Sequence, residues 1–137
     1  MITVLLADDH TMVRDGLRYI LEAAGDIQII AQASNGKEAV SHALNNCPNI
    51  AVIDISMPVM DGIQATREIL AICPHTRIVT LSMYHTGEYV QRALKAGALG
   101  YVLKDAAGNE LVEAVRTLHA GKRYFSPQVA KYDLQGS

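Results

Sequence analysis

The order of apolar and polar residues divides the chain into short apolar runs separated by longer amphipathic stretches. Five runs rich in Val, Ile, Leu and Ala are apolar on both alternating faces, and they are four to seven residues long. Runs of this kind are typical of strands that are covered on both faces, as in a parallel sheet. The pattern predicts strands at residues 3–7, 27–33, 50–54, 77–82 and 100–103.

The stretches between these runs carry apolar residues at helical spacing. In the first stretch, apolar residues from Val13 to Ala24 form one stripe, and Gly25 is a usual stop signal. The last stretch repeats this design, with a stripe from Leu111 to Leu118 and Gly121 as the terminator. The other helices are predicted at residues 36–46, 62–72 and 86–96, and Cys-Pro pairs end the first two of these.

Alternating strands and helices with short connections predict a doubly wound α/β sheet. The 137 residues, 50% of them hydrophobic, have room for one domain with a full core. Sheets of this class bind ligands at the carboxyl ends of their strands. Polar residues at those ends are therefore the candidates for chemistry.

The charge content argues against several classes of partner. Charged residues make up 19% of the chain and the formal net charge is −2, so nothing indicates binding of nucleic acid or an anionic membrane by this chain alone. No run approaches the roughly 18 apolar residues of a spanning helix, and the N-terminus lacks the features of a signal peptide. We therefore expect a cytoplasmic location.

The chain contains two cysteines, Cys47 and Cys73, and each precedes a proline. No paired-cysteine spacing near a histidine indicates zinc. We therefore expect two reduced thiols with structural roles.

Three aspartates follow or end predicted strands. Asp8 and Asp9 come directly after the first strand, and Asp54 closes the third. Two carboxylates about 4 Å apart repel by roughly 4 kcal/mol at an effective dielectric constant near 20, which calls for a shared proton or a cation. Because all the side-chain ligands are oxygens, Mg²⁺ is the natural ion. The alternative for the pair alone is an acid-rich helix N-terminus that complements the macrodipole.

Asp54 is the candidate nucleophile and phosphoryl acceptor, since it ends a buried strand just before a loop broken by Pro58 and Gly62. Lys104 ends the fifth strand and would pair with Asp54 in the same cleft. Ser82 offers a hydroxyl donor at the end of the fourth strand. Alone, Lys104 could be a solvated lysine and Ser82 could cap the next turn.

Taken together, these residues resemble the receiver domain of two-component response regulators. The resemblance covers nearly the whole chain and rests on the acidic pair, the Asp-x-x-Met-Pro-x-Met-Asp-Gly block from Asp54, Leu81-Ser82 and the Gly-Tyr-Val-Leu-Lys strand. Asp8-Asp9-His10, Lys104-Asp105 and residues 120–127 are similar to the NarL/FixJ subfamily, whose members usually carry a LuxR-type helix-turn-helix output domain. The resemblance implies a CheY-like, flavodoxin-like (βα)5 fold with a five-stranded parallel sheet in the order 2-1-3-4-5.

The resemblance also implies roles for the site residues. Asp9 and Asp54 would bind Mg²⁺ directly, Asp8 directly or through water, and the backbone carbonyl of Ser56 would be a further ligand. Asp54 would accept a phosphoryl group from the phosphohistidine of a sensor histidine kinase, with Lys104 stabilising charge on its oxygens.

Two residues would act as the switch. Ser82 would move toward the phosphoryl oxygens, and Tyr101 would rotate from solvent into the space that Ser82 leaves. The alternative for Tyr101 is an edge aromatic with its hydroxyl in water. On this view the chain is a phosphoacceptor switch, not an enzyme, although it catalyses its own phosphorylation and dephosphorylation.

The chain departs from the general receiver pattern in two places. Asp105 follows Lys104 where many receivers have proline after a cis bond, and a non-prolyl cis bond costs about 3 kcal/mol. We therefore expect a trans bond there. Met83 and Tyr84 are expected to crowd the mouth of the pocket, and to slow access by small phosphodonors and by hydrolytic water.

The remaining expectations concern partners and boundaries. Met12, Tyr19 and Ala23 form an apolar patch on the first helix, either a partner surface or scattered exposed residues. Resemblance to the subfamily favours a homodimer on phosphorylation through the first and last helices.

We interpret residues 1–124 as the receiver and 125–137 as the start of a linker to an absent DNA-binding output domain. Ser126-Pro127 predicts one more short helix, and Gly136-Ser137 is interpreted as a cloning remnant.

Two other classes of protein fit less well. Mg²⁺-dependent hydrolases resembling the haloacid dehalogenase group place their aspartyl nucleophile after the first strand, whereas Asp54 follows the third. A flavin or nucleotide module would need a glycine-rich phosphate loop where the chain has Asp8-Asp9-His10.

Overall fold

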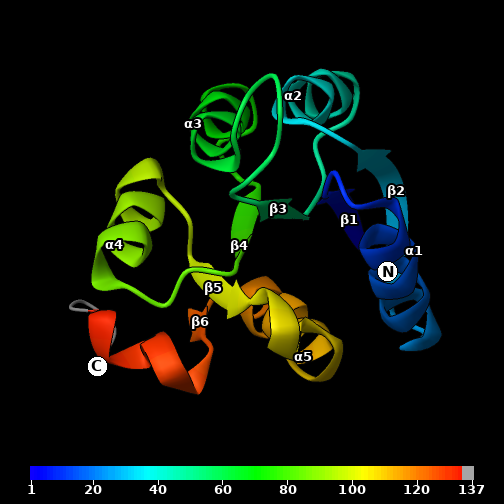
Figure 1. Cartoon of the computed structure of the whole chain (residues 1–137). Helices are drawn as coiled ribbons and strands as arrows, with labels where there is room; N and C mark the ends of the chain where they lie inside the picture. The colour runs from blue at the N-terminus through cyan, green and yellow to red at the C-terminus, as the bar shows by residue number, and fades with distance from the viewer. Residues whose placement is uncertain (134–137) are drawn as a thin grey trace.

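The computed structural model describes residues 1–133 and contains one sheet flanked by helices (Figure 1). The strands are β1 (Ile2–Ala7), β2 (Ile27–Ala33), β3 (Ile50–Asp54), β4 (Arg77–Ser82), β5 (Gly100–Leu103) and β6 (Tyr124–Phe125). The helices are α1 (Thr11–Ala23), α2 (Gly36–Asn45), α3 (Gly62–Ile72), α4 (Gly87–Ala96) and α5 (Ala107–His119), with short 3₁₀ helices η1 (Lys104–Ala106) and η2 (Pro127–Tyr132).

The strands pair in parallel in the order β2-β1-β3-β4-β5-β6. This confirms the predicted CheY-like order and adds a sixth strand that the apolar pattern missed, because only two residues form it. Four of the predicted strands have the predicted bounds, and β1 begins one residue earlier, at Ile2. Every peptide bond in residues 1–133 is trans, including the bond between Lys104 and Asp105, as expected.

The core has two halves, one on each face of the sheet. On β3, Ala51 and Ile53 pack into one half, whereas Ile50 and Val52 pack into the other. Helices α2, α3 and α4 cover the first face, and α1 and α5 cover the second (Figure 1). Because the sheet is covered on both faces, its strands are apolar throughout, which is why their sequence pattern is continuous.

The segment after α5 packs against the rest of the molecule. Strand β6 pairs with β5, and η2 lies beside α4. Ser126 precedes η2 and Pro127 opens it, so the predicted short helix is confirmed as a 3₁₀ helix. Val129 is fully buried in the core. The interpretation of Gly136-Ser137 lies outside the described residues.

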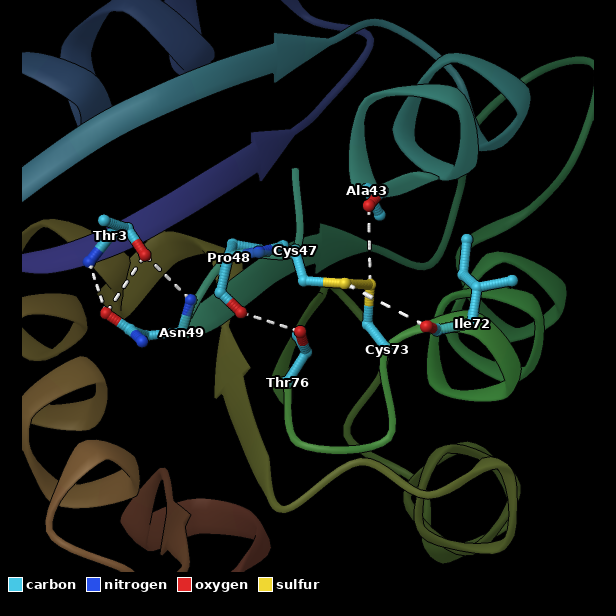
Figure 2. Close-up of a disulfide and its surroundings, with 8 residues drawn as sticks. All are labelled: Thr3, Ala43, Cys47, Pro48, Asn49, Ile72, Cys73 and Thr76. Carbon is cyan, nitrogen blue, oxygen red and sulfur yellow. Dashed lines mark hydrogen bonds between the residues drawn. A yellow bond between two sulfur atoms is a disulfide. The ribbon is translucent and has the colours of Figure 1, made fainter. Parts of the chain in front are cut away.

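The expectation of two reduced thiols is wrong in this structure, where Cys47 and Cys73 form a disulfide (Figure 2). The two residues are 26 positions apart in sequence, but they follow α2 and α3, whose C-terminal ends lie side by side, and their Cα atoms are 5.7 Å apart. This separation is within the range that a disulfide can bridge. Sequence spacing could not show it, because only the packing of α2 on α3 brings the two Cys-Pro pairs together.

Hydrogen bonds hold the loops around the disulfide. The Thr76 hydroxyl donates to the Pro48 carbonyl at 2.7 Å, and the Thr3 hydroxyl donates to Asn49 Oδ1 at 3.0 Å (Figure 2). These residues lie at the starts of the strands, so the disulfide is at the edge of the sheet opposite the carboxyl ends.

Among the described residues, every helix is too short or too polar to cross a lipid bilayer.

Candidate functional site

The carboxyl ends of the central strands bring the predicted site residues together. Asp8 follows β1, Asp54 ends β3 and Lys104 follows β5, so all three side chains start from the same edge of the sheet. Asp8 and Asp54 are 0% and 2% exposed. The strand ends thus gather charged groups where solvent screens them little.

The loop after Asp54 has a shape that only certain residues allow. Gly62 lies so close to β3 that a Cβ atom there would be 2.1 Å from the carbonyl oxygen of Asp54, which requires glycine. Asp61 caps α3 by accepting from the backbone N–H of Gln64 at 2.9 Å. Val59 adopts a left-handed conformation with φ of 71°. These features fix the path of the chain beside the buried carboxylate.

Lys104 is the cationic centre of the cluster. Its Nζ atom lies 2.8 Å from Asp54 Oδ2 and 3.2 Å from Asp8 Oδ1, and 3.0 Å from His10 Nδ1. The lysine side chain is only 10% exposed. The predicted pairing of Lys104 with Asp54 is therefore present.

Burial and charge shift the pKa values in this cluster. Burial raises the pKa of Asp54, Lys104 opposes that shift, and the nearby Asp8 carboxylate adds to it. Burial lowers the pKa of Lys104, but its contacts with Asp54 and Asp8 outweigh this effect and leave the pKa above its usual value. Lys104 therefore stays charged. Ionising Asp54 and Asp8 together in this buried cluster still costs electrostatic free energy, which a further cation would lower.

The acidic cluster has the donor set of a divalent metal site. Ligand atoms of Asp8, Asp9, His10 and Asp54 all lie within 4.8 Å of one another. Asp8 Oδ2 and Asp9 Oδ1 accept no hydrogen bond, and their nearest charged neighbours are Lys104 Nζ at 3.2 Å and His10 Nδ1 at 3.3 Å. Carboxylate oxygens gathered this closely fit a divalent cation, and carboxylates are the ligands that Mg²⁺ prefers. Ser56, expected to contribute its carbonyl, is exposed and donates its N–H to Asp54 Oδ1 at 3.1 Å.

Two residues of the cluster had no role predicted from the sequence. His10 is one of them, and its position directly after the acidic pair was the available signal. Arg14 is the other, and its guanidinium donates to the backbone carbonyl of Asp8 at 2.7 Å. That bond holds the loop between β1 and α1.

The two switch candidates lie on the neighbouring strands. Ser82 is buried, and its hydroxyl accepts from the backbone N–H of Tyr84 at 2.9 Å, which is the turn-capping role considered as an alternative. Tyr101 was expected to start in solvent, but it is 0% exposed and donates its hydroxyl to the Tyr84 carbonyl at 2.8 Å. Burial raises the pKa of Tyr101, so the hydroxyl remains a donor. The core of this structure has room for the Tyr101 ring, and the sequence alone could not show that.

A hollow of about 350 Å³ opens beside the cluster, and its lining includes His10, Met83, His85 and Lys104. Met83 is 72% exposed at its edge, as expected for a residue at the pocket mouth. Tyr84 does not line this hollow and instead stacks on Tyr89, with ring centroids 3.9 Å apart. Of the two residues expected to crowd the mouth, only Met83 borders the opening.

Comparison with known proteins identifies the family. The model of the response regulator receiver domain matches residues 4–116. The chain belongs to the response regulator receiver family. Its relatives include the response regulator GacA of Pseudomonas protegens, which is 38% identical over 131 residues that make up 96% of this chain and 62% of that protein.

Other members of the family show the same likeness. The uncharacterized transcriptional regulatory protein YxjL of Bacillus subtilis is 38% identical over 124 residues, 90% of this chain and 57% of that protein. A LuxR-family response regulator from Aurantimonas has a crystal structure with a TM-score of 0.90 and 35% identity, covering 95% of this chain and 93% of that chain. This receiver therefore falls in the NarL/FixJ subfamily, and it spans about 60% of the length of the curated relatives that it matches.

Proposed function

We propose that this receiver accepts a phosphoryl group on Asp54 and changes conformation in response. The observation that carries the proposal is the buried ammonium of Lys104, 2.8 Å from Asp54 Oδ2 within a cluster of carboxylates. A fixed cation beside the acceptor stabilises the charge that a phosphoryl group brings, and preorganised charge of this kind often contributes more to catalysis than any other single effect.

The phosphodonor is the phosphohistidine of a sensor histidine kinase. A carboxylate oxygen of Asp54 forms a bond to phosphorus as the bond from phosphorus to the imidazole nitrogen breaks. The electron pair of that bond stays on the nitrogen, and the ring leaves as neutral imidazole when its other nitrogen carries a proton. Lys104 then donates to an oxygen of the transferred group.

Mg²⁺ is the proposed cofactor, held by Asp8, Asp9, Asp54 and the backbone carbonyl of Ser56, and it would supply further positive charge to the phosphoryl oxygens. The close clustering of the Asp8, Asp9 and Asp54 carboxylates supports this assignment. Asp9 is the more accessible acid of the pair, with a side chain 31% exposed. An ion could therefore reach the cluster from the Asp9 side.

The proposed switch runs through Tyr84. If Ser82 turns its hydroxyl toward a phosphoryl group on Asp54, its bond with the Tyr84 N–H is lost. Tyr84 also holds the hydroxyl of Tyr101, so a shift of this loop changes the environment of Tyr101 and the start of α4. The phosphoryl group thereby biases a bistable element at a distance from the carboxylate.

The relatives support a proposal about the output and partners. Since this chain covers about 60% of their length and two structural neighbours are named as LuxR-family regulators, we propose control of dimerisation and of a LuxR-type DNA-binding domain beyond these residues. A cytoplasmic location is part of the same proposal.

Mass spectrometry tests the acceptor assignment. After incubation with acetyl phosphate or phosphoramidate and Mg²⁺, the protein should gain the mass of one phosphoryl group, and Asp54→Asn should gain none. Chelation of Mg²⁺ should abolish the gain in the wild type. Equal labelling of Asp54→Asn would show that the acceptor is another residue, and continuous turnover of phosphate esters would favour a hydrolase.

A further inference from the structure

We propose that Ser126 is a positioning residue for Lys104, and through it for phosphoryl transfer to Asp54. This inference rests on the proposed function and adds to it a side chain from the segment that follows α5. That segment lies beyond residue 116, where the match to the receiver family ends.

Hydrogen bonds from this segment hold the edge of β5 that faces away from β4. The Ser126 N–H donates to the Tyr101 carbonyl at 2.9 Å. Two residues further along β5 the acceptor is a side chain, because the Leu103 N–H donates to Ser126 Oγ at 2.9 Å. Ser126 therefore extends the hydrogen bonding along β5 as far as the residue before Lys104.

A carboxylate fixes the direction of the Ser126 hydroxyl. This hydroxyl donates to Glu110 Oε1 at 2.6 Å, which leaves an oxygen lone pair for the Leu103 N–H. Ser126 is 1% exposed, so bulk water does not compete for this position. Without the hydroxyl, the end of β5 must move or leave a buried N–H group without an acceptor, and either change is costly.

Ser126 is itself anchored on both sides. Before it, Phe125 pairs with Tyr101 in the sheet. After it, Val129 is fully buried in the core and donates its N–H to the Ser126 carbonyl at 3.0 Å. The serine is therefore a fixed point against which the end of β5 is held.

The position of Lys104 depends on that strand end. Leu103 directly precedes the lysine, whose Nζ atom must lie 2.8 Å from Asp54 Oδ2 on another strand. On its other side, Leu103 is in register with Ser82 of β4. Loss of the Ser126 contact would leave the end of β5 held from one side only, and small displacements of a charged group can cost large factors in rate.

The rate of mass gain of the whole chain with phosphoramidate and Mg²⁺ tests the inference. Ser126→Ala should slow labelling of Asp54 by about tenfold, and Ser126→Thr, which keeps the hydroxyl, should restore most of that loss. The matched control is Thr76→Val, which removes a buried hydroxyl that donates to Pro48 at the opposite edge of the sheet. That variant should label within about twofold of the wild type, because the two sites are distant and independent.

A double-mutant cycle separates positioning from a general loss of stability. In a Lys104→Met background, Ser126→Ala should slow labelling by less than about twofold, because the group that Ser126 positions is absent. Equal slowing in both backgrounds, or a wild-type rate in Ser126→Ala, would overturn the inference and leave the acceptor assignment standing. Failure of the wild type to gain a phosphoryl group would instead contradict the proposed function.

Glu110→Ala carries the same test if Ser126→Ala does not fold. This variant keeps the Ser126 hydroxyl but removes the carboxylate that directs it, so labelling should slow when Lys104 is present and not in the Lys104→Met background. The Leu103 amide should also exchange with solvent faster than in the wild type. Unchanged labelling and unchanged exchange in Glu110→Ala would then overturn the inference.

Discussion

At the scale of single residues, Lys104 is the group on which the site depends most. Its ammonium contacts Asp8, His10 and Asp54, which come from two other strand ends. Two buried carboxylates next to each other would repel strongly, and the lysine offsets part of that repulsion. The same charge is in position to stabilise a phosphoryl group on Asp54.

Lys104→Met should slow phosphoryl labelling of Asp54 by roughly a hundredfold to a thousandfold, as removal of a preorganised donor does elsewhere. Methionine keeps most of the length of the side chain but has no charge. The measurement is the rate of mass gain with phosphoramidate and Mg²⁺, compared with Lys95→Met, which replaces an exposed lysine on α4. Similar rates in the two variants would contradict this role.

Asp54→Asn should stabilise the fold at neutral pH. The pKa of Asp54 is raised by burial, so ionisation of this group costs stability. A carboxyl with a raised pKa contributes stability that is present below its unfolded value of 3.8 and is lost as pH rises through its folded pKa. The gain in melting temperature should therefore be larger at pH 7 than at pH 4, without added divalent metal. A gain that is larger at pH 4 would show that the lysine, not burial, dominates.

At the scale of elements, the segment after α5 packs against the sheet and α4. Ser126 Oγ accepts from the Leu103 N–H at 2.9 Å and donates to Glu110 at 2.6 Å. The Tyr124 hydroxyl also donates to Glu110, and burial together with that carboxylate raises the pKa of Tyr124 to about 12. Tyr132 packs against the start of α4. Movement of α4 must therefore disturb η2.

The packing of η2 on α4 predicts opposite effects for two glycine substitutions. A Cβ atom at Gly87 would lie 2.8 Å from the Tyr132 ring, so Gly87→Ala should destabilise the protein by about 1–3 kcal/mol. Gly16 lies in α1 with no neighbouring atom within 4 Å of such a Cβ, so Gly16→Ala should stabilise by about 1 kcal/mol. Chemical denaturation of both variants measures these changes. Stabilisation of similar size in both variants would show that η2 is not held against α4.

The disulfide links the ends of α2 and α3, and it should stabilise the fold by about 2–4 kcal/mol, mainly by restricting the unfolded chain. A dithiol reductant should lower the melting temperature of the wild type, but not that of Cys47→Ser. Labelling of Asp54 should continue after reduction, because the disulfide lies at the opposite edge of the sheet. An unchanged melting temperature would mean that the bond contributes little.

At the scale of the whole molecule, the exposed apolar residues of α1 are candidates for contact with a second copy. Met12 and Tyr19 are 88% and 75% exposed. In contrast, β6 extends the sheet beyond β5 and η2 packs beside α4, so that side of the molecule is already partly covered. The α1 surface therefore remains the better candidate for the proposed dimer.

Sedimentation velocity with Mg²⁺ and the phosphomimetic BeF₃⁻ should show a monomer that becomes a dimer. Tyr19→Lys should prevent the change, whereas Leu44→Lys, at an exposed apolar residue on α2, should not. A wild type that is monomeric in both states would count against dimerisation, and loss of the dimer in both variants would count against this interface.

The sequence by itself determined the order of strands and helices and the gathering of Asp8, Asp54 and Lys104. Both follow from local patterns, because a strand buried on two faces must be apolar throughout and parallel strands end at a common edge. Family resemblance supplied the strand order, which the structure bears out.

Only the tertiary structure decided the disulfide, the sixth strand, the inward position of Tyr101 and the place of His10 in the cluster. Each depends on how close two segments distant in sequence come, or on how much space the core leaves for one ring. Cys47 and Cys73 meet because α2 packs on α3, and β6 forms because β5 offers it a free edge. Distances of that kind are set by packing of the whole chain, which no local run of residues records.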